Sequence, residues 1–150
     1  MAVSVTPGAM LSLDAGLSLR MRRKKILTSE RAPDYTAIIG EAALRQQVGG
    51  TLVMRTQLQA LLRMGQRENI RLQVLPFTAG AHPAHGGAFT WLRLDSGNLE
   101  VILTETLTSA QYVETESELR KYREVWCQLR EQALSEAASL AMFERLASAL

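Results

Sequence analysis

Hydrophobic and polar positions follow one another along this chain with two different periods. The clearest helical period starts at Thr51, and its apolar positions are Leu52, Met54, Leu58, Leu61 and Leu62. Apolar residues at spacings of three and four form one face of an amphipathic helix. Segment 70–75, IRLQVL, alternates residue by residue instead and is followed by Pro76. This alternation predicts a strand that stops at the proline.

The same two periods predict the helices and strands in the rest of the chain. They predict a short basic helix at 17–27, a strand at 35–39, a helical turn at 41–45, strands at 89–94 and 99–104, a short edge strand at 112–113, and helices that start at Thr115 and after Ser135. The sequence DSGN at 95–98 is a strong turn signal and joins two of these strands into a hairpin. The order helix, strand, helix, strand, strand, strand, helix, helix predicts an α/β fold.

Length and composition fit one domain. The chain has 150 residues and a mass of 16.6 kDa, with 47% hydrophobic and 21% charged residues. These values are typical of a single globular domain that buries its own core. We expect a single-domain α/β sandwich at 17–150, with a mixed sheet and flanking helices, preceded by a flexible arm at 1–16.

Charge and cysteine content narrow the classes of function. The 17 basic and 15 acidic residues leave a net charge of +2, which is weak support for nucleic-acid binding. The single cysteine, Cys127, excludes an internal disulfide framework and a thiolate-clustered zinc site, and it favours a reducing compartment. No apolar stretch approaches the ~20 residues that span a bilayer. Because the first nineteen residues also lack the charge order of a signal peptide, we predict a cytoplasmic protein without membrane contact.

A basic run at 20–25 is the one strongly charged segment. It holds Arg20, Arg22, Arg23, Lys24 and Lys25 without an interleaved aromatic residue. Such a run contacts phosphate in some proteins and is a solvated helix face in most. We expect no sequence-specific DNA binding.

Several segments together resemble a known family. The run IIGEAALRQQVGG, the helix after it, the segment IRLQVLPFTAGAHPAHGGAFTWLRL and the segment LEVILTETLTSAQYVE with its closing helix are similar to the DUF5753 domain, also called the Scr1 domain. The resemblance covers roughly 17–150 and is most specific at 74–89. It implies a domain of actinobacterial regulators that senses a ligand or partner behind an N-terminal helix-turn-helix of the Xre type, often beside a small DUF397 protein. The strand order also resembles, more distantly, half of a phospholipase-D-type sandwich.

This chain departs from the family pattern at two places. The residues that precede the resembling part are too few for a helix-turn-helix, so we expect a stand-alone relative without the DNA-reading module. Leu103 stands ahead of Glu105 where the family often has an aromatic residue. The phospholipase likeness does not carry its activity, because neither His82 nor His85 belongs to a His-x-Lys pair.

Candidate acid–base residues come from one loop and two strand ends. His82 and His85 share the loop at 77–88, where two imidazoles serve as acid and base, bind a metal, or only cap and order the loop. Glu41 and Glu105 each follow a predicted strand. Either carboxylate acts as a general base at a ligand crevice, or forms a structural ion pair with Arg45 or Arg93.

Candidate ligand-binding residues are mostly aromatic. Phe89 and Trp91 point to the same face of their strand. They line an apolar pocket if no helix covers that face, and are plain core if a helix does. With His85, Arg45 and Tyr112 they make up the predicted ligand-binding set, beside the catalytic candidates Glu105, His82 and Glu41. We expect the loop at 80–89 to form one wall of the site.

Two functions remain open on these observations. The first is a non-catalytic sensor or regulatory domain that binds a small molecule or a small protein. The second is a cofactor-independent enzyme of secondary metabolism, a cyclase or isomerase that works by shape and orientation. Neither function needs a cofactor or metal. An exposed edge strand and two amphipathic C-terminal helices further predict a homodimer.

Overall fold

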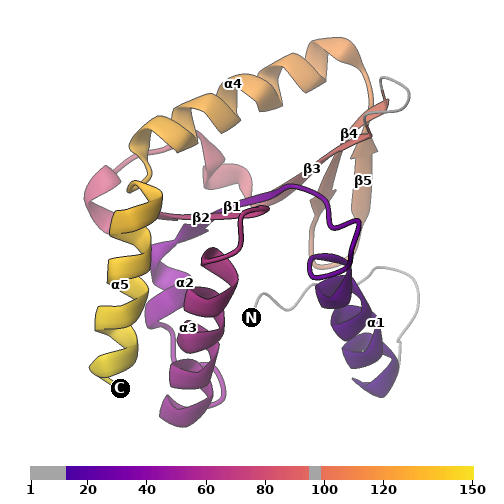
Figure 1. Cartoon of the computed structure of the whole chain (residues 1–150). Helices are drawn as coiled ribbons and strands as arrows, with labels where there is room; N and C mark the ends of the chain where they lie inside the picture. Colours follow the sequence, from indigo (N-terminus) through magenta and orange to yellow (C-terminus); the bar gives the residue numbers. More distant parts are fainter. Residues whose placement is uncertain (1–12, 95–98) are drawn as a thin grey trace. The chain divides into compact units, whose positions relative to one another are not determined.

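The computed structural model describes residues 13–94 and 99–150, which form two compact units (Figure 1). The terminal unit comprises the described residues up to Gly80 and those from Gln132 onward, and the central unit runs from Ala81 to Glu131. The predicted turn at 95–98 and most of the predicted arm, 1–12, lie outside the described residues. Within the described ranges, no helix combines the length and apolar content needed to cross a bilayer.

The terminal unit is built on a βαβ crossover. Its elements are α1 (Leu13–Ile26), β1 (Tyr35–Gly40), α2 (Glu41–Arg45), α3 (Thr51–Gly65), β2 (Ile70–Leu75), the 3-10 turn η1 (Phe77–Ala79) and α5 (Glu136–Ser148). β1 and β2 pair in parallel from Tyr35 opposite Ile70 to Gly40 opposite Leu75. Parallel neighbours need a crossover connection, and here α2 and α3 supply it.

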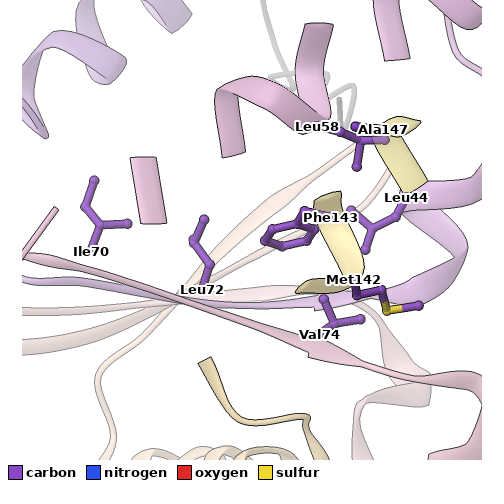
Figure 2. Packing of buried hydrophobic residues seen from close by; sticks show 8 residues of the cluster. All are labelled: Leu44, Leu58, Ile70, Leu72, Val74, Met142, Phe143 and Ala147. Carbon is purple, nitrogen blue, oxygen red and sulfur yellow. The ribbon is translucent and has the colours of Figure 1, made fainter. Parts of the chain in front are cut away.

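The core of the terminal unit lies between α3, α5 and the β1–β2 sheet. Figure 2 shows its buried side chains, which are Leu44, Leu58, Ile70, Leu72, Val74, Met142, Phe143 and Ala147. Leu58 belongs to the apolar stripe that the helical period predicted, and it is completely buried together with Val74 and Phe143. The apolar residues that the helical period and the strand alternation predicted therefore pack together in one core.

The connection before α5 covers the outer edge of β2. Leu134 donates its backbone N–H to the carbonyl oxygen of Val74 at 2.8 Å, and the Gln73 side-chain amide donates to the Leu134 carbonyl at 3.0 Å. Val74 in turn donates its N–H to Ser139 Oγ at 2.9 Å. Ser135 caps α5 as predicted, because its side chain accepts the N–H of Ala138. The backbone groups of Val74 that face away from β1 are therefore satisfied.

The central unit is a three-stranded antiparallel sheet with one helix. It contains the 3-10 segment η2 (Pro83–Gly86), β3 (Phe89–Leu94), β4 (Leu99–Glu105), β5 (Ala110–Val113) and α4 (Glu116–Gln132). The strand order is β3-β4-β5. Buried Ile102, Val113 and Leu119 join α4 to one face of the sheet. Thr115 starts the helix as predicted, since its carbonyl accepts the N–H groups of Glu118 and Leu119.

The mixed α/β class and the order of elements are confirmed. The strands form two separate sheets, however, whereas the sequence predicted one mixed sheet. The reason lies at 77–88, where η1 and η2 are flanked by Gly80 and Gly87 at φ of 67° and 127°. These turns connect β2 to β3. After them the chain continues into β3, which pairs with β4 and not with β2. α1 begins at Leu13, inside the predicted arm.

Candidate functional site

The predicted site residues belong to both units. Glu41 and Arg45 lie on α2 of the terminal unit. The other six are in the central unit, and they are His82, His85, Phe89, Trp91, Glu105 and Tyr112. The structure therefore divides these residues into two groups, one in each unit, and the larger group belongs to the unit that contains the β3–β4–β5 sheet.

One face of this sheet is covered by α4. Phe89 and Trp91 both point to the covered face, where Phe89 lies 5.1 Å from the Tyr122 ring and Trp91 lies 6.2 Å from the Trp126 ring. The first pair of rings is tilted and the second is edge-to-face, and such contacts are typical of packed aromatic cores. The apolar-pocket interpretation of these two residues required an uncovered face, and the structure shows them between helix and sheet.

Arg123 ties the covered face to the start of α4. Its Nε donates to Glu100 Oε1 on β4 at 3.0 Å, and its Nη1 donates to Glu116 Oε1 at 2.7 Å. These hydrogen bonds hold the pKa of both carboxyl groups below their ordinary value. The sequence patterns did not predict this bridge. The spacing of Glu116 and Arg123, seven residues on one helix, is the signal that places them on one helix face.

The opposite face of the sheet is apolar, and several of its described side chains are exposed. Leu92, Leu94, Leu99 and Tyr112 are 51%, 59%, 51% and 66% exposed. The register makes them neighbours, because Leu92 pairs with Val101, Leu94 with Leu99 and Tyr112 with Leu103. We call these six residues the uncovered face. Strand alternation places them all opposite the Phe89 and Trp91 side.

β3 is also a free edge of this sheet. In the described part of the chain, no backbone hydrogen bond outside the β3–β4 ladder uses a β3 group. Thr90, Leu92 and Leu94 are its residues on the uncovered side, and none is charged. Proteins usually protect such an edge with charge, proline or a covering segment. β2 has such a covering segment in Leu134 and Ser139.

The remaining acid–base candidates belong to the same unit. Glu105 is exposed at the end of β4, opposite Ala110. His82 is half-buried just before η2, and His85 is part of η2. Among the residues that the structure describes, no group of three or more His, Cys, Asp and Glu is arranged to hold a metal ion.

Glu41 is a buried carboxylate, 7% exposed, that joins the ends of two strands. Its Oε2 accepts the Phe77 N–H at 2.8 Å, directly after β2, and its Oε1 accepts Arg45 Nε–H at 2.6 Å. The Phe77 hydrogen bond, with help from Arg45, lowers the pKa of Glu41 against the opposing effect of burial. Both oxygens of this carboxylate are thus engaged within the terminal unit.

The fold and these surfaces define a small mixed α/β protein with two compact units and an apolar sheet face. Its sequence matches the family described as "Domain of unknown function (DUF5753)" over residues 7–145, so the chain belongs to that family. No curated protein matches the chain. No solved structure matches it either, and the distant likeness to phospholipase D therefore has no support from a structure.

Proposed function

We propose that this chain is a non-catalytic, partner-binding regulatory domain whose binding surface is the uncovered face with the free edge of β3. The observation that carries the proposal is the set of exposed apolar side chains, Leu92, Leu94, Leu99 and Tyr112, gathered on one side of one sheet. Contiguous exposed apolar patches of this kind mark interaction sites in soluble proteins. Complete burial of one leucine side chain contributes about 1.5–3 kcal/mol.

The chemistry of the edge specifies the partner. A free strand edge is completed by an extended backbone, and the uncharged side chains of Thr90, Leu92 and Leu94 favour apolar residues on that backbone. β3 itself has both properties. We therefore commit to a second copy of this chain as the partner, paired through its own β3.

Antiparallel pairing of two β3 strands brings no like charges together on the uncovered face. A two-fold axis at Leu92 sets Leu92 opposite Leu92 of the second copy, and Thr90 opposite Leu94 of the second copy. No like charges face each other on the uncovered side, and the two sheets become continuous. The apolar patch of each copy then extends across the joint.

The regulatory role agrees with the sensing role implied by the resemblance to domains of actinobacterial regulators. The enzyme alternative relies on an apolar pocket beside Phe89 and Trp91. Those two side chains pack against Tyr122 and Trp126 of α4. The packing favours a binding domain over an enzyme with that pocket.

Hydrogen–deuterium exchange at two protein concentrations tests the proposal. Backbone amides of β3 that point away from β4 exchange fast in a monomer and are protected in a β3–β3 pair. We expect peptides covering 89–94 to gain protection as concentration rises, while peptides covering 70–75 stay unchanged, since Leu134 and Ser139 already cover the edge of β2. Equal exchange of 89–94 at both concentrations, over the range where the protein self-associates, would overturn the β3 interface.

A further inference from the structure

The terminal unit contains a groove that the partner-binding surface does not use. It lies between α2, the start of α3 and the end of α5, and has a volume of about 190 Å³. Leu44, Met54, Leu146 and Leu150 give it an apolar wall, and Arg45 and Gln47 give it a polar rim. The groove is open to solvent, so a ligand can enter without movement of the fold.

Arg45 is held at this rim by a buried partner. Glu41 fixes the guanidinium through its Nε at 2.6 Å, while the Arg45 side chain stays 50% exposed. Among the hydrogen bonds within the described residues, none uses Nη1 or Nη2 of Arg45. The two terminal nitrogens are thus available as a planar fork whose direction is already set.

The charge around this fork favours an anion. Arg145, one residue before Leu146, also acts on the Glu41 carboxylate. Among the residues that line the groove, Arg45 carries a charged side chain, and its fork places positive charge at the rim. Planar Arg forks bind carboxylates through two parallel hydrogen bonds.

We propose that this groove binds a small organic carboxylate with a short apolar body. The carboxylate accepts hydrogen bonds from Arg45 Nη1 and Nη2, and the apolar body lies along Leu44, Met54 and Leu146. Small-molecule sites usually measure about 300–1,000 Å³. The smaller groove therefore selects a short aliphatic chain over a large ring system.

The role of Glu41 in this site is positioning. It does not touch the ligand, and it orients the Arg45 fork from the buried side, as an outer carboxylate orients a binding residue in many sites. This assigns a function to an ion pair that otherwise only links α2 to the chain after β2.

Octanoate is the probe, and calorimetric titration of the full chain is the measurement, below the concentration at which octanoate forms micelles. We expect saturable binding of octanoate with one site per chain. 1-Octanol and octylammonium share the chain but lack the anion, and we expect each to bind roughly 10- to 100-fold more weakly, the loss that corresponds to charged hydrogen bonds. Equal binding of octanoate and octanol, or no binding of octanoate, would overturn the proposal.

A variant pair locates the site. Arg45→Met should weaken octanoate binding by the same factor, whereas Arg63→Met, an exposed arginine in the last turn of α3, should leave it unchanged. Equal affinities of the two variants would contradict the site. If Arg45→Met does not fold, NMR shifts of the Met54 and Leu146 methyl groups in the unsubstituted chain give the same decision, because octanoate must shift them at concentrations at which octylammonium, the weaker ligand, leaves them unchanged.

Discussion

Ser139 of α5 accepts a hydrogen bond from the backbone N–H of Val74 in β2 at 2.9 Å, although the two residues are 65 positions apart in sequence. Ser139 is completely buried, and its hydroxyl donates to the Ser135 carbonyl at 2.8 Å. One serine thus completes the edge of β2 and joins it to the first turn of α5.

Replacing Ser139 by alanine should destabilise the protein. Ser139→Ala leaves the Val74 N–H buried without an acceptor, which costs about 1–3 kcal/mol. Ser148→Ala, an exposed serine at the end of the same helix, should change the free energy of unfolding by less than about 0.5 kcal/mol. Urea unfolding of both variants measures the difference, and equal stabilities would show that the Val74 contact contributes nothing.

Glu41 should make the protein more sensitive to acid. Its pKa is lowered from an ordinary value of 4.5, chiefly by the Phe77 N–H, so its ionised form is favoured by folding. This stabilisation is complete above the ordinary pKa and is lost as the pH falls through the lowered value. Glu41→Gln should therefore be less stable than the unsubstituted protein at about pH 7 and closer to it at about pH 3. Glu144→Gln, on the exposed side of α5, is the control, and a parallel pH dependence of Glu41→Gln and the unsubstituted protein would contradict the assignment.

Arg123 should control the acid response of the central unit. Its hydrogen bonds to Glu100 and Glu116 lower the pKa of both carboxyl groups, so this bridge also stabilises above their ordinary pKa and weakens in acid. We expect Arg123→Met to lower the thermal midpoint at neutral pH and to reduce its fall in acid. Arg130→Met, an exposed arginine of the same helix, should do neither. The fluorescence of Trp91 and Trp126 reports the transition, and identical behaviour of the two variants would exclude the bridge as its cause.

Two glycines should respond in opposite ways to alanine. A Cβ on Gly65 would lie 2.6 Å from Leu140 Cδ2 of α5, so Gly65→Ala should cost about 1 kcal/mol or more through overpacking. Gly40 has a φ of −63° and open space around it, so Gly40→Ala should stabilise by about 0.4–1 kcal/mol. Denaturant titration of the pair decides the sign at each site, and a stable Gly65→Ala would mean that Leu140 moves freely.

The sequence patterns predicted the elements better than their assembly. The period from Thr51 and the alternation of IRLQVL gave α3 and β2 because those signals are local. The β3–β4 strands have apolar residues on both faces, Phe89 and Trp91 on one and Leu92 and Leu94 on the other. Tertiary packing determines which of the two faces α4 covers, and local periodicity contains no information about it.

Most of the polar contacts could not be predicted for the same reason, because they join residues that are close in space but far apart in sequence. Glu41 was predicted as a strand-end residue. Its contact with Phe77 spans 36 positions, and no periodic pattern in the sequence indicates such a contact. The bridge from Arg123 to Glu100 spans 23 positions, and the contact of Ser139 with Val74 spans 65. The polar contacts that could be predicted are local, such as the Ser135 cap, whose partner Ala138 lies three residues away, and the pair of Glu41 with Arg45.

The mass of the full chain in solution tests the proposed self-association most directly. Light scattering at micromolar concentrations should report about 33 kDa, twice the 16.6 kDa of one chain, and Leu92→Lys should return it to the mass of one chain. Leu52→Lys makes the same charge change at an exposed leucine outside the uncovered face and should keep the doubled mass. A mass of one chain for the unsubstituted protein throughout this range, or a doubled mass for Leu92→Lys, would contradict pairing through β3.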